Sequence, residues 1–201
     1  MPPRIVMWGG GGSAGPKMAP GTYTVKVSSG AWSATETFRL RTDPRYVPEM
    51  TAAEGAEQLR LAREIGGEVK DLYDNLLRIR DVKTQASAIA EKTGAGSPIS
   101  NAAKTLRDRL EAVEGDMTQL QGEGGQDALN FPGRMDNQLT ALYGAIIGPE
   151  RRMGTPVLER YKDLKPQVDQ LKTRWHEALK TEVAAFNAAA AKVGLGPIVV
   201  K

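Results

Sequence analysis

The feature that most constrains this fold is a long series of apolar residues spaced alternately three and four positions apart. The series is Ala62, Ile65, Val69, Leu72, Leu76, Ile79, Ala86 and Ile89. This spacing places all of its members on one face of an α-helix. We therefore predict a single amphipathic helix near 51–92, which would be ~60 Å long at the usual rise per residue.

Both ends of this predicted helix carry recognisable signals. Thr51 and Glu54 have the spacing of a capping box, in which each side chain accepts a hydrogen bond from the other residue's backbone amide. Thr93-Gly94 is a typical helix end. Gly66-Gly67 is the expected weak point, since each glycine in a helix costs roughly 1 kcal/mol relative to alanine.

Three further amphipathic helices are predicted, near 98–121, 134–147 and 155–194. Pro98 suits a first helical turn, and Thr155-Pro156 supplies an N-cap followed by proline. Pro166 is expected to kink the last helix or to mark a join within it. Because four apolar stripes must cover one another, the expected fold is mainly α: an elongated antiparallel bundle of three long or medium helices plus one short one, with coiled-coil-like packing.

The first 45 residues follow a different pattern, with alternating apolar and polar residues. Strands are predicted over 22–28 and 34–41, with Ser28-Ser29-Gly30-Ala31 as the turn of an antiparallel hairpin. Residues 4–8 are a shorter third candidate. The expected domains are thus a partial immunoglobulin-like (Ig-like) β unit, 1–45, and a helical bundle, 46–201.

Three strands are too few to close an Ig-like sandwich, which needs about seven. The β unit could pack on the helices or on a second copy of itself, or its other strands could lie upstream of Met1. The last of these alternatives is the one we favour.

Composition narrows the functional classes. Of 201 residues, 40% are hydrophobic and 25% charged, none is cysteine and only one is histidine. Disulfides, thiolate metal sites and cysteine nucleophiles are therefore excluded. The net charge is +3, but the sequence contains no stripe of basic residues with aromatic residues between them. We therefore expect no nucleic-acid partner. No apolar run approaches the ~18–20 residues of a membrane span, and we expect neither a membrane partner nor a signal peptide.

No set of residues satisfies the spacing of a catalytic or metal site. His176 and its neighbour Glu177 would not face each other on a helix, so a surface histidine is expected. The carboxylate pairs Asp71–Asp74 and Glu111–Glu114 alternate with basic residues, which is typical of solvated helix faces. The glycine run 9–12 lacks the Lys-Ser/Thr ending of a phosphate-binding loop. We therefore predict a protein that is not an enzyme and has no cofactor or metal.

Four aromatic residues in or near the β unit form the candidate interaction surface: Trp8, Tyr23, Trp32 and Tyr46. Aromatic side chains gathered on a sheet could contact carbohydrate. They are also common in strands for packing alone, so the carbohydrate hypothesis has little support.

Several segments together resemble a known family. The stretch from Gly15 to Val25, GPKMAPGTYTV, and the later Asp43-Pro44-Arg45 are similar to the Ig-like module of bacterial sortilin-like, BNR-repeat proteins of the glycosyl-hydrolase type. In that family a helical C-terminal region follows. Its landmarks resemble Phe131-Pro132-Gly133, Thr155-Pro156 and Phe186-Asn187 before Gly194.

The resemblance covers most of this chain but only the C-terminal end of the family. The family's β-propeller, with its Asp-box repeats, has no counterpart here, so no catalytic residue can be carried over. The resemblance implies a structural or protein-interaction module, the C-terminal accessory part of a larger exported protein, extracellular or periplasmic, whose partners are its own upstream domains. The alternative is a self-contained small helical protein that self-associates or docks another chain through the bundle and the β edge.

Overall fold

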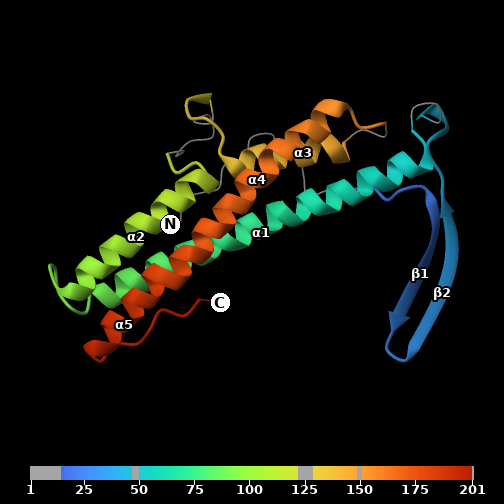
Figure 1. Cartoon of the computed structure of the whole chain (residues 1–201). Helices are drawn as coiled ribbons and strands as arrows, with labels where there is room; N and C mark the ends of the chain where they lie inside the picture. Colours follow the sequence, from blue (N-terminus) through green and yellow to red (C-terminus); the bar gives the residue numbers. More distant parts are fainter. Residues whose placement is uncertain (1–14, 47–49, 122–128, 149–150, 201) are drawn as a thin grey trace. The chain divides into compact units, whose positions relative to one another are not determined.

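The computed structural model describes residues 15–46, 50–121, 129–148 and 151–200. Its elements are β1 (Gly21–Ser29), β2 (Trp32–Leu40), the 3-10 turn η1 (Pro44–Tyr46), α1 (Ala52–Ala90), α2 (Pro98–Met117), α3 (Met135–Ile147), α4 (Thr155–Ala178), the π-helical turn η3 (Leu179–Val183) and α5 (Ala184–Lys192) (Figure 1). The mainly helical fold with a small antiparallel β unit is thus confirmed. The candidate strand 4–8 lies outside the described residues.

The chain divides into two compact units that share three helices. One unit contains 68–140 and 162–201; the other contains 11–67 and 141–161. The domain boundary predicted between residues 45 and 46 marks the change from the β pattern to the helical pattern in the sequence, and it stays a prediction. The two compact units are defined differently, by which parts of the folded chain pack together.

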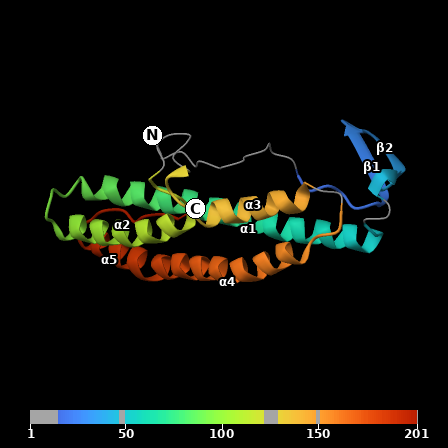
Figure 2. The ribbon, with the colours of Figure 1, turned by 90° about the horizontal axis from the view of Figure 1, so that it is seen from above.

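In the larger unit, the second half of α1, α2, and the run from α4 to α5 pack as antiparallel neighbours, and α2 lies beside α5 (Figure 2). The core is built from the predicted stripes, including the fully buried Leu76, Ile79, Leu110, Trp175 and Phe186. The chain after α5 folds back onto this unit. The amide group of Asn187 exchanges hydrogen bonds with the backbone of Ile198, and that of Gln85 with the backbone of Val199.

In the smaller unit, the start of α1 has the predicted capping box. The Glu54 amide donates to Thr51 Oγ1 (3.2 Å) and the Thr51 amide donates to Glu54 Oε2 (2.7 Å). The Gln58 side chain then ties α1 to the end of α3 by donating to the Ile146 carbonyl at 2.6 Å. Tyr161, at the start of α4, donates to Glu64 Oε1 at 2.8 Å. These hydrogen bonds hold together the start of α1, the end of α3 and the start of α4 within the smaller unit, which also contains the β hairpin.

Pro166 was expected to kink the last helix or to mark a join within it. It lies inside α4, which continues through it to Ala178, so it does not mark a join, and the kink stays a prediction. The interruption comes later, at the π-helical turn η3. Val193, expected on the buried stripe, is exposed at the C-terminal end of α5, because the helix ends there with Gly194 at a φ of +73°.

Candidate functional site

The β hairpin has one mainly apolar face and one polar face. In the register of β1 and β2, Tyr23 lies opposite Phe38, Val27 opposite Ala34, and Ser29 opposite Trp32. Directly opposed residues share a face of the sheet, so these side chains lie on one face together with Val25, Leu40 and the exposed Glu36, which lies opposite Val25. The other face carries Ser, Thr, Lys and Arg side chains alone. We call the first face the apolar hairpin face: Tyr23, Val25, Val27, Trp32, Ala34, Phe38 and Leu40.

Most of the apolar hairpin face is uncovered in the described part of the chain. The exposed fractions are 44% for Val25, 55% for Val27, 59% for Trp32 and 50% for Phe38. Within the face, the rings of Tyr23 and Phe38 stack with centroids 5.9 Å apart, and the Tyr23 hydroxyl donates to the Ala19 carbonyl. The half-buried members of the face are Tyr23, Ala34 and Leu40.

Both long edges of the hairpin lack a strand partner among the described residues, because its sheet has two strands. Unpaired edge groups are a template for pairing with another strand. The hairpin therefore offers two modes of association: packing of the apolar hairpin face on a second sheet, about 10 Å away, and addition of a strand to an edge.

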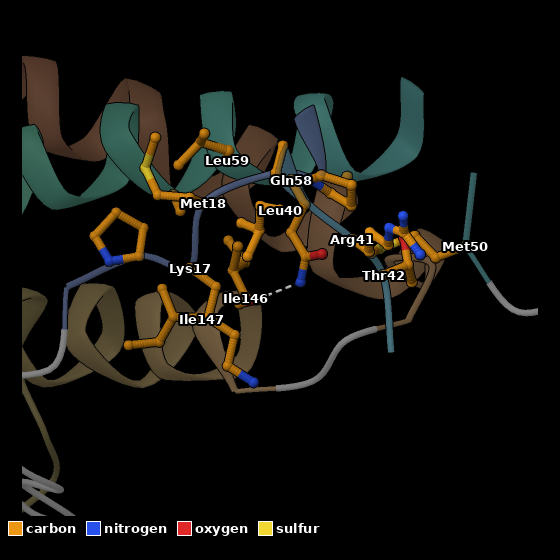
Figure 3. A pocket seen from close by; sticks show the side chains of 15 residues that line it. Lys17, Met18, Leu40, Arg41, Thr42, Met50, Gln58, Leu59, Ile146 and Ile147 are labelled. Atoms are coloured by element: carbon orange, nitrogen blue, oxygen red, sulfur yellow. Dashed lines mark hydrogen bonds between the residues drawn. The ribbon is translucent and has the colours of Figure 1, made fainter. Parts of the chain in front are cut away.

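A cavity of about 370 Å³ lies at the base of the hairpin (Figure 3). Its walls come from residues 16–20, the end of β2, the start of α1 and the end of α3. Leu40, Leu59 and Ile146 contribute to its apolar lining. We call this space the hairpin-base cavity.

The charged groups at this end of the hairpin are arranged asymmetrically. Asp43 accepts hydrogen bonds from the side chain and the backbone amide of Arg45, which lower the pKa of its carboxyl to about 2. Arg41, two residues earlier, lines the hairpin-base cavity and makes no hydrogen bond or ion pair within the described ranges.

The four aromatic residues of the predicted interaction surface are distributed as follows. Tyr23 and Trp32 share the apolar hairpin face but lie near its opposite ends, about 20 Å apart at the rise of a strand. Tyr46 ends η1, after the hairpin. Trp8 lies outside the described residues, as does the glycine run 9–12. The carbohydrate hypothesis stays a prediction. Val25, Val27 and Phe38 could not be predicted as surface residues, because alternation in a strand cannot distinguish a covered face from an exposed one.

The residues considered for catalysis are spread over separate surfaces. His176 is exposed on α4, and Asp74 pairs with Lys70 along the surface of α1 at 2.5 Å. Glu114 corrects the expectation of a solvated face. It is 1% exposed, and its oxygens lie 2.6 Å from Arg80 Nε and 2.9 Å from Lys83 Nζ. It was misassigned because alternating charges look alike whether they face water or a neighbouring helix.

The described ranges contain no cluster of three or more acidic, histidine or cysteine side chains able to hold a metal ion. No helix in the part of the chain that the structure describes has the length and apolarity to cross a membrane. Comparison with family models, curated proteins and solved structures finds no match to this chain.

Proposed function

We propose that this chain is a non-catalytic interaction module, the C-terminal accessory part of a larger exported protein of the sortilin-like, BNR-repeat type. The observation that carries the proposal is the uncovered apolar hairpin face. Complete burial of a valine or phenylalanine side chain contributes roughly 1.5–3 kcal/mol, and four side chains of this face are about half exposed. A covering sheet would therefore stabilise the hairpin substantially.

A sheet is the partner that fits this face best. An isolated two-stranded hairpin is marginally stable, and sheets with one apolar face are stabilised by packing on a second apolar face. The resemblance supplies such a sheet, since in the family the segment like Pro20–Val25 belongs to an Ig-like module. In this chain that segment forms the first half of β1, and Asp43-Pro44-Arg45 begins three residues after the end of β2. Both landmarks of the resemblance thus belong to the hairpin or its immediate continuation.

The alternative is a self-contained protein that docks through a strand edge. Its support is the two-stranded sheet, whose edges are unpaired in the described residues. Edge pairing between two copies would produce a dimer at micromolar concentration. Sedimentation velocity separates the cases, because a monomer at that concentration argues against self-association.

The size of the native polypeptide tests the proposal directly. An antibody raised against residues 51–201 would be used to blot an extract of the source cells. A band several times heavier than 21.7 kDa would support an accessory module, and a band at 21.7 kDa would overturn it.

Hydrogen exchange then tests the role of the hairpin. The amides of residues 21–40 are expected to exchange more slowly in the native long polypeptide than in the 201-residue chain, because a covering sheet suppresses opening of the hairpin. Amides of α2 provide the internal control and should exchange equally in both. Equal exchange of the hairpin in the two proteins would contradict sheet completion.

A further inference from the structure

The hairpin-base cavity has the size and lining of a small-molecule site. Its volume of about 370 Å³ lies within the range of ligand pockets, roughly 300–1,000 Å³. Leucine, isoleucine, methionine, proline and alanine side chains form most of its walls. Two of these, Met18 and Met50, are unbranched thioethers that can adapt to the shape of an apolar guest.

The charged residues that line the cavity in the described part of the chain are both basic. They are Lys17 and Arg41, among fifteen described lining residues. In Figure 3, Arg41 lies with Thr42 and Met50 at one side of the cavity, and Lys17 lies with Ile147 at the other. An apolar space with cations at its margins complements a molecule that has an apolar body and a negative group.

Among the residues that the structure describes, the carboxylates near Arg41 are paired with other cations. Asp43 forms its ion pair with Arg45, and Glu54 forms one with Arg152 at 2.9 Å. The Lys17 ammonium donates to the Gly148 carbonyl at 3.1 Å. The guanidinium of Arg41 can therefore present its fork of donors to an incoming carboxylate, which is the geometry it binds best.

We propose that the hairpin-base cavity binds a small amphiphilic carboxylate, with the carboxylate paired to Arg41 and the apolar chain between Leu40, Leu59 and Ile146. The apolar walls disfavour sugars and nucleotides, whose many polar groups would be left without partners. This inference does not depend on the proposed function, because it rests on residues of this chain alone.

Octanoate, titrated into the ¹⁵N-labelled 201-residue chain and followed by NMR, is the test. We expect saturable shifts of the amides of Leu40, Leu59 and Ile146. The matched neutral probe is octan-1-ol, which should bind at least several-fold more weakly because it cannot form the charge-assisted hydrogen bonds. Equal affinity for the two probes, or no saturable shifts with octanoate, would overturn the proposal.

Two arginine-to-glutamine substitutions test whether Arg41 is the residue that pairs with the carboxylate. Arg41→Gln should weaken octanoate binding about tenfold, as expected for loss of a hydrogen-bonded charge pair. Arg39→Gln, two residues earlier in β2 and not lining the cavity, should leave the affinity unchanged. Both side chains are exposed, so neither change endangers folding. Equal effects would show a nonspecific charge effect and overturn the assignment to Arg41.

Two further variants distinguish the cavity from the apolar hairpin face, which could also adsorb an amphiphile. Leu59→Trp fills the cavity and should abolish the shifts, with circular dichroism confirming that the helices remain. Val27→Thr changes the hairpin face alone and should preserve them. Loss of binding in Val27→Thr with retention in Leu59→Trp would move the site to the hairpin and refute the cavity.

Discussion

Gly66 and Gly67 are adjacent in α1, yet they differ in what lies opposite them. A Cβ atom at Gly66 would stand 3.2 Å from the Cε2 atom of the Tyr143 ring, whereas a Cβ atom at Gly67 would meet nothing within 4 Å. Tyr143 belongs to α3, so Gly66 permits a close approach of the two helices. Gly67 has no such role.

We therefore expect different results from the same substitution at the two positions. Gly67→Ala should raise the free energy of unfolding by about 1 kcal/mol, because alanine loses less backbone entropy and gains helix propensity. Gly66→Ala should gain less than this or destabilise, because the Tyr143 ring must move by a few tenths of an ångström. Urea denaturation of both variants measures the difference, and an equal gain in both would contradict the contact with Tyr143.

Asp43 provides a prediction about pH. The hydrogen bonds from the Arg45 side chain, and then from its backbone amide, lower the pKa of Asp43 from 3.8 to about 2. A carboxyl whose pKa is lowered by folding contributes stability above its unfolded pKa and loses it as the pH falls through the folded value. The contribution of Asp43 is therefore complete above about pH 4 and should disappear as the pH falls towards 2.

Carbon-detected NMR titration of the Asp43 carboxyl should show its midpoint near pH 2. In Arg45→Gln the midpoint should return towards the ordinary value, since the charged donor is lost. A titration unchanged by this substitution would assign the low pKa to another cause.

At the scale of helix pairs, Glu114 joins α2 to α1. Its carboxylate is almost fully buried, and it pairs with Arg80 and Lys83, whose side chains are 16% and 23% exposed. The partners are thus unequal: either cation could turn towards solvent if the pair were broken, but the carboxylate could not. Removing both cations should therefore cost more than removing the carboxylate.

The double variant Arg80→Met, Lys83→Met should lower the free energy of unfolding by about 3–5 kcal/mol, because it leaves an unpaired buried charge. Glu114→Gln should cost less. The exposed pair Lys70–Asp74 is the control, and Lys70→Met should change stability by less than about 1 kcal/mol. Thermal or urea unfolding at pH 7 compares the three, and a Glu114 variant less stable than the double variant would contradict the burial argument.

The helices and the hairpin could be predicted from sequence because each has a single strong apolar period, but the interruption at η3 could not. The buried positions of α4 advance by three or four residues up to Ala178, and the next buried position is Val183, five residues on. A five-residue step is the spacing of a π turn. The prediction passed from Ala178 directly to Phe186, eight residues on, which two ordinary steps of four satisfy equally well. Val183 was therefore the missed signal.

The burial of Ile198 and the existence of the hairpin-base cavity could not be predicted from sequence, for a different reason. Ile198 is buried because Asn187 and Gln85 bind the backbone of the last residues, and no periodic pattern records such a long-range contact. The hairpin-base cavity likewise combines residues from segments more than a hundred positions apart. Local patterns specify elements, whereas these features arise from how the elements meet.

At the scale of the molecule, the core and the hairpin are separate. Every buried apolar side chain among the described residues lies at Leu61 or later in the chain, and none belongs to β1 or β2. The buried apolar core of the described residues thus contains no side chain of β1 or β2, although the half-buried Leu40 lines the hairpin-base cavity together with Ile146. The hairpin adds surface area, and its stability must depend on its own pairing and on whatever covers its apolar face.

Excision of the hairpin tests this separation. Gly21 and Leu40 are directly opposed, with Cα atoms about 5 Å apart, so a Gly-Gly linker can replace residues 22–39 while Leu40 keeps its place in the hairpin-base cavity. The excised chain should retain its helical circular dichroism, and its midpoint of thermal unfolding should fall by no more than about 2–4 °C, the equivalent of 1 kcal/mol in a protein of this size. A much larger fall would make the hairpin an integral layer of the helical fold. A small one would leave recognition of another sheet as the reason for an exposed apolar face.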